Sequence, residues 1–348
     1  MLDSQIESLR EWFIQRKRFF PWRENPSPYA VWISEVMLQQ TRASVVVDYF
    51  TRWMERFPTI ASLAEAPISE VLKCWEGLGY YSRARNIKAA AESLHVKGES
   101  IPDTLEALLS IKGIGSYTAG AILSFAFHQK AAAVDGNVSR VVSRYFELEE
   151  DLTQVKAKKE LQNKTLSLLP DKEPWVIMEA LIELGATLCT GTPKCLECPL
   201  STGCMSYLNG TTASIPLKKK RKETIYLHKQ VALIVYDEEI LIEIKEEGKV
   251  LGGLTEFPSF AYSLDSEVEN QIEEHLGIKV KWQADLREER QSFTSYQVDL
   301  SPSLFYLSLK TEIPGFLWVK IDGLKSLTFS SGHKRILHQL LGFNVFAS

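Results

Sequence analysis

The chain has 348 residues, 45% of them hydrophobic and 24% charged, with a net charge of −4. The length predicts two domains of ordinary globular composition. No apolar run reaches the ~18 residues that cross a bilayer, which excludes membrane-spanning helices. The N-terminus, MLDSQIESLREWFIQRKRFF, predicts an amphipathic helix and no targeting segment, so we expect a cytoplasmic protein, from a bacterium.

The charge is distributed unevenly along the chain. Residues 1–222 carry a net charge of +3, and residues 223–348 carry −7. A mildly basic first part can present a basic face to nucleic acid, whereas the acidic second part is a poor nonspecific binder of DNA.

The first part of the chain predicts one helix after another. Apolar residues recur at spacings of three and four in segments such as VWISEVML, VVVDYFTRWMERF, IKAAAESL and VIMEALIELG. Short stretches rich in Pro, Gly, Asp and Ser separate these segments, and no useful strand-like alternation interrupts them. We therefore predict an all-α domain over residues 1–207.

A polar segment and a second domain follow. Residues 208–227 contain Pro and the run KKKRK, which predicts a linker whose charges are either solvated or lie along a phosphate backbone. Beyond it, KQVALIVYD, EILIEIKE and SPSLFYLSL are typical of strands. VENQIEEHLG and GHKRILHQLLG are typical of helices, so residues 228–348 predict a small α+β domain.

Four of the five cysteines lie within sixteen residues, with the spacing C-x5-C-x2-C-x5-C. This cluster is not a disulfide framework but is typical of a thiolate site for a metal. Both zinc and a [4Fe–4S] cluster accept four thiolates. Zinc sites more often use two separated CxxC pairs, so the compact spacing favours iron–sulfur. The four residues are Cys189, Cys195, Cys198 and Cys204.

A Gly-Ile-Gly turn stands between two apolar runs in IKGIGSYTAGA, residues 111–121. A helix–turn–helix of this kind aims free backbone N–H groups at one point, where they can bind a phosphate. A plain tight connection between helices is the other interpretation of Gly113 and Gly115.

Two carboxylates stand in contrasting surroundings. Glu35 lies within the apolar helix VWISEVML, where burial would raise its pKa and keep it protonated as a general acid; an exposed polar face is the alternative. Asp135, in AAAVDGNVSRVV, is placed as a helix N-cap, whose amides should hold it ionised. One acid and one carboxylate suit the cleavage of a bond to an anomeric carbon.

These segments together resemble the helix-hairpin-helix, endonuclease III-like superfamily of DNA glycosylases, and within it the MutY adenine glycosylases. The similar text includes FPWRENPSPYAVWISEVMLQQTR, WEGLGYYSRARNIKAAA, IKGIGSYTAGAI, VDGNVSRV and ELGATLCT. The resemblance covers residues 8–204 and, more weakly, the rest. It implies an all-α glycosylase domain with an iron–sulfur loop, followed by a smaller Nudix-like α+β domain.

The resemblance implies a monofunctional adenine DNA glycosylase, here a monomer, acting on double-stranded DNA with adenine opposite 8-oxoguanine or guanine. Glu35 would protonate N7 of the flipped-out adenine, and Asp135 would stabilise the oxocarbenium ion on the deoxyribose. Tyr117 and Asn137 would position these groups. Tyr117 occupies the place of the lysine nucleophile of bifunctional relatives, so strand cleavage through a Schiff base is not expected.

The resemblance also assigns the remaining positions. The adenine pocket would be lined by Trp22, Arg23 and Glu179. The residues that wedge the duplex open would be Gln40 and Tyr80, although an ordinary core role is the alternative for Trp22 and Tyr80. The phosphate would be held by Gly113, Gly115 and Ser116. The lesion would be read by Phe293, Thr294 and Ser295, and the [4Fe–4S] cluster would be bound by Cys189, Cys195, Cys198 and Cys204.

The chain departs from the family pattern at several points. Thr255, in LGGLTEFPSF, replaces the usual tryptophan, and Ser295 replaces the histidine of the usual Phe-Ser-His motif. Thr294 keeps a hydroxyl that can accept from the N7–H of 8-oxoguanine, but Ser295 cannot supply the imidazole. We therefore expect a reduced preference for 8-oxoguanine over guanine, since one such contact is worth about 1–3 kcal/mol. The first cysteine gap is five residues rather than six, which predicts a more labile cluster. SEVENQIEEHLG lacks the arginine of a Nudix hydrolase helix, so we expect no nucleotide hydrolysis.

Three other functions compete with this interpretation. The first is an endonuclease III-like pyrimidine glycosylase with lyase activity, against which Tyr117 argues. The second is a catalytically silent DNA-binding relative, against which Glu35, Asp135 and Asn137 argue. The third is an iron–sulfur electron carrier or a zinc-stabilised scaffold.

Overall fold

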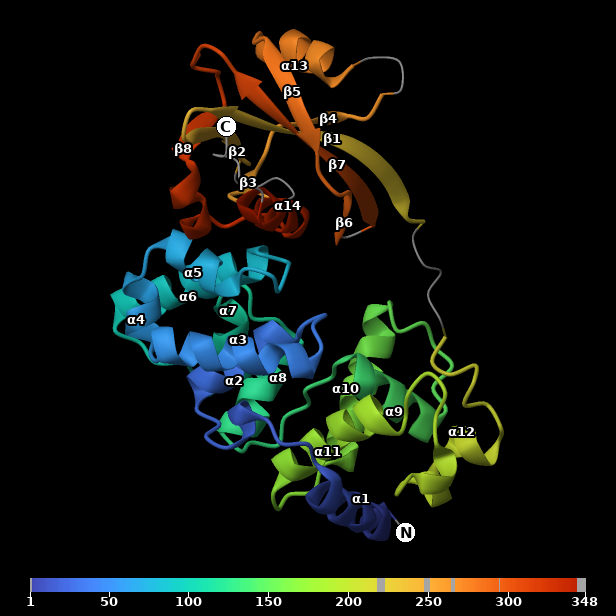
Figure 1. Cartoon of the computed structure of the whole chain (residues 1–348). Coiled ribbons are helices and arrows are strands. Elements are labelled where there is room, and N and C mark those ends of the chain that lie inside the picture. Colours follow the sequence, from blue (N-terminus) through green and yellow to red (C-terminus); the bar gives the residue numbers. More distant parts are fainter. Residues whose placement is uncertain (1, 218–222, 247–250, 264–266, 294, 343–348) are drawn as a thin grey trace. The chain divides into compact units, whose positions relative to one another are not determined.

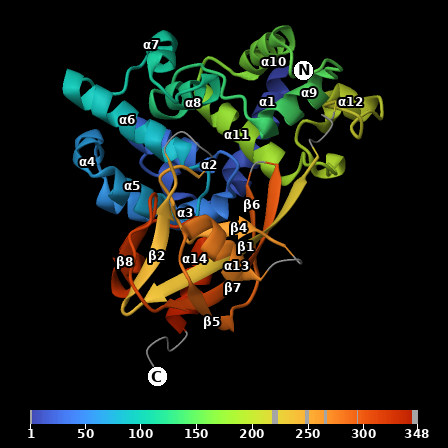
Figure 2. The ribbon, with the colours of Figure 1, turned by 90° about the horizontal axis from the view of Figure 1, so that it is seen from above.

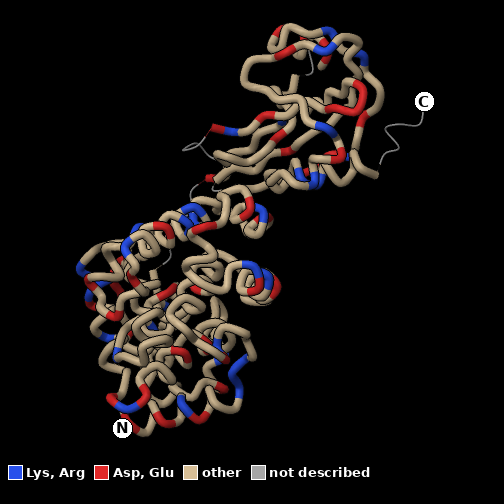
Figure 3. Tube along the Cα trace, turned by 90° about the vertical axis from the view of Figure 1, so that its left-hand side faces the viewer, with Lys and Arg blue, Asp and Glu red and all other residues tan. Residues whose placement is uncertain are grey.

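The computed structural model describes residues 2–217, 223–246, 251–263, 267–293 and 295–342, and it divides the chain into two compact units (Figure 1). The first unit consists of Met1–Ala66 and Arg85–Lys220, and the second of Pro67–Ala84 and Arg221–Ser348. Residues 67–84, which lie inside the predicted helical domain, thus group with the C-terminal residues. Acidic and basic residues are interspersed over both units (Figure 3).

The first unit is helical throughout its described residues, as the apolar spacing predicts. Its α-helices are α1 (Leu2–Arg16), α2 (Pro28–Leu38), α3 (Ala43–Arg56), α4 (Ile60–Glu65), α7 (Leu105–Ser110), α8 (Ser116–Ala121), α9 (Gly136–Phe146), α10 (Val155–Leu168), α11 (Pro174–Thr187) and α12 (Met205–Leu208). Short 3-10 turns occur at Pro21–Arg23, Cys195–Glu197 and Ser201–Gly203, and a π-helical turn at Ile122–Ala126 follows α8. Helix α6 (Ser82–Lys97) begins in the second unit and continues into the first.

Helix α2 is buried nearly all round, which is what places a carboxyl group in the interior. Ser27 caps the helix by accepting a 3.1 Å hydrogen bond from Ala30 N–H, and Pro28 supplies the first turn. From Tyr29 to Met37 every residue is buried. An apolar helix without a polar face packs only inside a core, so its single carboxylate is buried with it.

The Gly-Ile-Gly turn connects α7 to α8 as the sequence predicts. Gly113 has a φ of 90°, a conformation that favours glycine, and a Cβ there would meet the Cβ of Asn86 at 2.7 Å. Gly115 is the N-cap of α8, and Gly115 and Ser116 are exposed. The turn therefore presents backbone N–H groups outward at a helix start.

Helix α9 is the centre of the second half of this unit. It packs against α10, α11 and α12, and α11 also contacts α1 from the other end of the sequence (Figure 1).

The described part of the expected linker is packed against this unit. Arg144 of α9 donates a 2.9 Å hydrogen bond to the carbonyl of Ile215, which is only 3% exposed. Asn209 and Thr211 donate to the Glu147 carboxylate at 2.5 and 2.6 Å. The run KKKRK, residues 218–222, lies outside the described residues.

The second unit contains a mixed sheet with helices on both faces (Figures 1 and 2). The strand order is β3-β2-β1-β7-β5, with β4 also on β1, β6 on β7 and β8 on β2. The strands are β1 (Ile225–Tyr236), β2 (Glu239–Ile244), β3 (Thr255–Glu256), β4 (Ser259–Ala261), β5 (Val280–Asp285), β6 (Glu289–Phe293), β7 (Tyr296–Leu307) and β8 (Leu317–Lys320). The predictions of β1, β2 and β7 are confirmed.

Alternation along β1 and β7 creates the two cores of this unit. Val231, Leu233 and Val235 face α14 (Ser331–Gly342). Ala232 and Ile234 face α13 (Val268–Leu276), and Figure 1 shows these helices on opposite sides of the sheet. Both helices were predicted from segments that each end in a Gly, and both are confirmed. Helix α5 (Ile68–Trp75) completes the unit, and none of the helices among the described residues is long and apolar enough to span a membrane.

Candidate active site

A cavity of about 970 Å³ opens in the first unit. It lies between the turn at Pro21–Arg23, α2, the start of α8, the start of α9, and α11. Eight of the predicted site residues line it together, although they are scattered over more than 150 positions of the sequence: Trp22, Arg23, Glu35, Gln40, Tyr117, Asp135, Asn137 and Glu179.

Glu35 is a buried acid with a strongly perturbed pKa. Its relative exposure is 5%, which excludes the exposed-face interpretation. Burial raises the pKa of Glu35 from 4.5 to about 7. A hydrogen bond from the Tyr117 hydroxyl to the Glu35 Oε2 lowers this pKa and so partly opposes burial. The negative charges of Asp135 and Glu179 raise this pKa further, and Arg23 lowers it. A carboxyl group with this pKa is protonated for much of the time near neutral pH, as a general acid needs.

Asp135 caps helix α9, as predicted. Its Oδ1 accepts a 2.7 Å hydrogen bond from Val138 N–H, and its Oδ2 accepts a 2.8 Å bond from the Asn137 amide. Burial raises the pKa of Asp135 above its ordinary value, while these hydrogen bonds and the charge of Arg140 lower it. The hydrogen bonds still oppose that rise, so the acid with the pKa of about 7 is Glu35.

Asn137 is held in turn by an arginine that the sequence analysis did not single out. Arg140 donates to the Oδ1 of Asn137 at 2.8 Å and to the carbonyl of Gly185 at 2.6 Å. Its Nε donates to the carbonyl of Cys189 at 2.6 Å. One turn of α9 thus joins the cavity to the cysteine loop. The spacing of three residues between Asn137 and Arg140 places both on one helix face, which is the pattern that predicts such a contact.

A network of ion pairs between two arginines and two glutamates of α11 lies at the cavity wall that contains Arg23 and Glu179. Arg23 contacts Glu179 at 3.1 Å and donates to the fully buried Glu183 at 3.0 Å. Arg18 donates to the other oxygen of Glu183 at 2.5 Å. Burial raises the pKa of Glu179, while Arg23 lowers it. Glu183, four residues after Glu179 on α11, was also missed, although that spacing predicts a shared face.

Trp22 is packed in the core and also lines the cavity. Its ring stacks on Phe20 at 4.7 Å and meets the edge of Phe50 at 5.6 Å, so the side chain is part of the core. It also lines the cavity beside Arg23. A wall made of a packed indole can accept a flat aromatic ring without moving.

The predicted phosphate contacts and Tyr80 do not line the large cavity, whereas Gln40 does. Gly113, Gly115 and Ser116 do not line it; Ser116 borders a second cavity of about 270 Å³ with Tyr117. Gln40, which lines the large cavity, has a positive φ of 59°. Tyr80, in the second unit, has a φ of 48° and is 46% exposed, so it is not a core residue.

The four clustered cysteines surround one small space. All four line a cavity of about 20 Å³. Arg144 donates to the Cys189 Sγ at 3.4 Å and to the carbonyl of Thr190 at 2.6 Å. Burial raises the pKa of Cys198 to about 12, and the neighbouring thiols raise it further while a backbone hydrogen bond lowers it. No group of three described His, Cys, Asp or Glu side chains has an arrangement that could hold a single metal ion.

The predicted lesion-reading residues lie at a hairpin of the second unit. Phe293 ends β6 and pairs with Tyr296 at the start of β7, with ring centres 5.7 Å apart. The carbonyl of Ser295 accepts a 2.8 Å hydrogen bond from Ile225 N–H, and Thr294 lies outside the described residues. Thr255, at the family's tryptophan position, is a buried residue of β3.

Comparisons with known proteins agree with this geometry. Residues 33–169 match the HhH-GPD superfamily base excision DNA repair proteins, and residues 230–339 match the NUDIX domain. The adenine DNA glycosylase of Buchnera aphidicola subsp. Baizongia pistaciae is 38% identical over 247 residues, 70% of each chain. That of Mus musculus is 42% identical over 211 residues, which cover 58% of this chain but 41% of the mouse protein.

Solved structures support the fold of the helical unit. A thermostable thymine-DNA glycosylase matches with a TM-score of 0.55 and 27% identity, over 60% of this chain and 97% of that one. A trapped endonuclease III–DNA covalent intermediate matches with a TM-score of 0.51 and 23% identity, over 60% and 96%. The predicted combination of a helix-hairpin-helix glycosylase fold and a Nudix-like domain is confirmed. The chain therefore belongs to the adenine DNA glycosylases, the N-glycosylases that remove adenine in base excision repair of DNA.

Proposed function

We propose that this glycosylase releases adenine paired with 8-oxoguanine or guanine in double-stranded DNA, with Glu35 as general acid and Asp135 as stabiliser of the sugar cation. The observation that carries the proposal is the buried Glu35, whose pKa is raised to about 7 in the same cavity as Asp135. The family supplies adenine as the base that leaves.

The reaction begins when the target nucleotide leaves the duplex and enters the cavity. Protonated Glu35 gives its proton to N7 of adenine, which makes the base a better leaving group. The N-glycosidic bond then breaks with its electron pair going to the base, and positive charge develops on the deoxyribose. Water adds to the anomeric carbon and loses a proton, which leaves an abasic site.

Asp135 faces the developing charge on the sugar. Its carboxylate is oriented by Val138 N–H and Asn137, and Asn137 is oriented by Arg140. A negative charge whose partners are already in place needs no reorganisation during the reaction. Trp22, Arg23 and Glu179 form the wall against which the adenine lies.

Tyr117 makes the enzyme monofunctional in this account. A phenol cannot form a Schiff base with the opened sugar, so no lyase step follows base release. Its hydroxyl instead donates to Glu35 and orients the acid. The endonuclease III-like alternative requires an amine, and no lysine lines the large cavity among the described residues.

We further propose that the four cysteines bind a [4Fe–4S] cluster. They suit this group because all four are thiols and all four line one space. The four cysteines would hold the cluster as thiolates, and its bonds to them would tie the loop of residues 189–204 together beside α9. Arg144, which donates to the Cys189 Sγ, would partly neutralise the thiolates.

In this proposal, the duplex is opened by Gln40 and Tyr80. The phosphate is held by Gly113, Gly115 and Ser116. The orphan base is faced by the hairpin of Phe293 and Ser295. Left-handed backbone at Gln40 and Tyr80 and the exposure of Tyr80 support the first role. The proposal for the hairpin rests on the family resemblance, with Thr294 outside the described residues.

The test is single-turnover release of adenine from duplexes with A opposite 8-oxoguanine, A opposite guanine and A opposite thymine, with alkali added afterwards to cleave abasic sites. We expect release from the first two duplexes only, and strand cleavage only after alkali. Strand cleavage before alkali together with an adduct trapped by borohydride would support the lyase alternative, and binding without release would support the silent relative.

A further inference from the structure

A buried carboxylate, Glu76, stands directly before the turn that contains Tyr80. It directly follows helix α5 and precedes Gly77 and Gly79, whose φ values are 109° and 71°. The turn is closed by hydrogen bonds from Trp75 Nε1 to the Gly79 carbonyl at 3.0 Å and from Gly77 N–H to the Tyr81 hydroxyl at 3.2 Å. The position of Tyr80 is therefore set by the residues around Glu76.

Glu76 holds a segment more than 250 positions away in the sequence. Its Oε1 accepts a 2.9 Å hydrogen bond from Phe329 N–H, and its Oε2 accepts one of 2.7 Å from Lys334 and one of 3.0 Å from Lys73. Lys73 also donates to the carbonyl of Leu327 at 2.8 Å. Burial would raise the pKa of Glu76, but the bonds from Lys334, Phe329 N–H and Lys73 lower it. We name residues 327–334, at the start of α14, the bridging segment.

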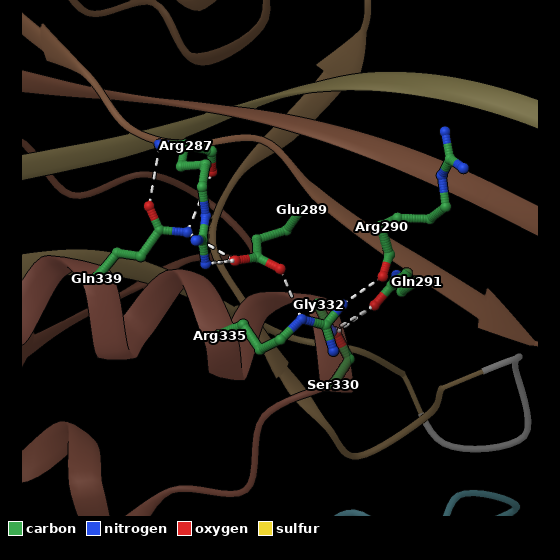
Figure 4. A network of polar contacts seen from close by, with 8 residues as sticks. All are labelled: Arg287, Glu289, Arg290, Gln291, Ser330, Gly332, Arg335 and Gln339. Carbon is green, nitrogen blue, oxygen red and sulfur yellow. Dashed lines mark hydrogen bonds and ion pairs between the residues drawn. The ribbon is translucent and has the colours of Figure 1, made fainter.

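Gln291 of β6 holds the other side of the bridging segment (Figure 4). Its Oε1 accepts from Gly332 N–H at 2.9 Å and from the Ser330 hydroxyl at 3.4 Å. A Cβ at Gly332 would meet that same oxygen at 2.7 Å, so the contact requires a glycine. Gln291 is 6% exposed and lies two residues before Phe293, the first residue of the hairpin.

Further hydrogen bonds attach β6 and the residues before it to α14. Arg335 donates to Glu289 at 2.6 Å and to the carbonyl of Arg290 (Figure 4). Gln339 donates to Glu289 at 2.8 Å and accepts from Arg287 N–H at 2.9 Å. The β6 region is thus attached to α14 at three positions of the helix, Gly332, Arg335 and Gln339.

We propose that Glu76 and Gln291 are positioning residues that join the Tyr80 turn and the Phe293–Tyr296 hairpin into one recognition element through the bridging segment. The functional part of this proposal rests on the proposed function, in which Tyr80 opens the duplex and the hairpin reads the orphan base. All of these residues belong to the second unit. A base seated on the hairpin then biases the position of the wedge, and the helical unit carries out the chemistry.

The experiment compares Glu76→Gln, Gln291→Leu and the double variant in the full chain. Glu76→Gln replaces an acceptor for two ammonium groups with an amide of the same shape, and Gln291→Leu removes an acceptor at nearly constant volume. Glu92→Gln is the matched control, because Glu92 also binds a lysine, Lys88 at 2.7 Å, but is exposed and belongs to the first unit.

Hydrogen–deuterium exchange measures the connection without DNA. We expect each single variant to speed exchange by about tenfold, the loss of one charge-assisted or buried hydrogen bond, in residues 77–81, in the bridging segment and in residues 289–293. The control should change none of them. Exchange that rises only beside each substituted residue would overturn the proposal.

Base release tests the functional part. The ratio of single-turnover rates for A opposite 8-oxoguanine and A opposite guanine should fall by about tenfold in each single variant, and no further in the double variant, because both act through one segment. Additive losses, or equal losses on both duplexes, would contradict it. If the unsubstituted protein releases no adenine at all, the proposed function fails, and the exchange result still decides whether the recognition element exists.

Discussion

The hydroxyl of Tyr117 donates a hydrogen bond to the carboxylate of Glu35 inside the cavity of the helical unit. This contact stabilises the ionised form of Glu35, whereas burial stabilises the protonated form. The balance leaves the pKa at about 7, where a carboxyl group can act as an acid at neutral pH.

Removal of that hydroxyl should therefore change a pH profile as well as a rate. Because the Tyr117 bond lowers the pKa of Glu35, Tyr117→Phe should move the alkaline limb of the adenine-release profile to higher pH. Tyr145→Phe is the control, since Tyr145 binds Gln5 away from the cavity. An unchanged limb in Tyr117→Phe would show that the contact does not tune the acid.

The buried acid should cost stability at high pH. The pKa of Glu35 is raised in the folded protein, so its stabilising protonation is complete below about pH 4.5 and is lost as the pH rises through about 7. Glu35→Gln carries no charge at any pH. It should be more stable than the unsubstituted protein at pH 8.5 by up to about 3 kcal/mol, with little difference at pH 4.5. Urea unfolding at both pH values measures this, and a gain independent of pH would contradict it.

Arg140 should matter to catalysis although it does not line the cavity. Arg140→Met removes the bonds to Asn137, Gly185 and Cys189. Adenine release should slow by about 10- to 100-fold, which corresponds to a loss of about 1.5–3 kcal/mol for the charge-assisted bond to Asn137, without loss of duplex binding. Arg10→Met, which breaks a 2.7 Å pair with Glu173 elsewhere in the unit, should leave the rate unchanged. Equal rates in the two variants would show that Asn137 needs no support.

Gly185 should be intolerant of a side chain for the same reason. A Cβ there would meet the Cβ of Asn137 at 2.6 Å, whereas a Cβ at Gly191 would meet nothing within 4 Å. Gly185→Ala should displace Asn137 and slow adenine release, with a loss of about 1–3 kcal/mol in unfolding free energy from overpacking. Gly191→Ala should change neither quantity. Normal rates in Gly185→Ala would mean that α9 and α11 separate without cost.

The cysteine site should bind iron rather than zinc. Iron and sulfide analysis of the protein purified without oxygen should give about four of each per chain, and Cys198→Ser should lose them together with visible absorption. One zinc per chain and no sulfide would contradict the cluster, and would leave the catalytic proposal standing.

The sequence predicted capping by Asp135, because an acid stands directly before a helical run. It left the burial of Glu35 open, and the structure decides it, because α2 has no polar face. The net pKa of Asp135 did not follow, because desolvation depends on how other helices close over it. Arg140, Glu183 and Glu76 were missed because their partners are distant in sequence or their spacing alone is common.

The second unit shows the same limit. Long alternating strands such as β1 and β7 were predicted, while β3 and β4 have only two and three residues and carry no pattern. Strand β6, ERQSF, is mostly polar; it pairs with β7 and is attached to α14 by Arg335 and Gln339 rather than by apolar alternation. The edge that matters for the proposed recognition element is thus specified by side-chain hydrogen bonds.

The most direct test of the account is the pH dependence of single-turnover adenine release from a duplex with A opposite 8-oxoguanine. We expect a rate that falls about tenfold per pH unit above a pKa near 7. On the acid side, we expect the rate to fall as the pH is lowered and Asp135, whose pKa burial raises, becomes protonated. Glu35→Gln should lose at least about 100-fold in rate and lose the alkaline limb. A Glu35→Gln enzyme that keeps the rate, or an unsubstituted enzyme with no fall between pH 7 and 9, would contradict the assignment of Glu35 as the general acid.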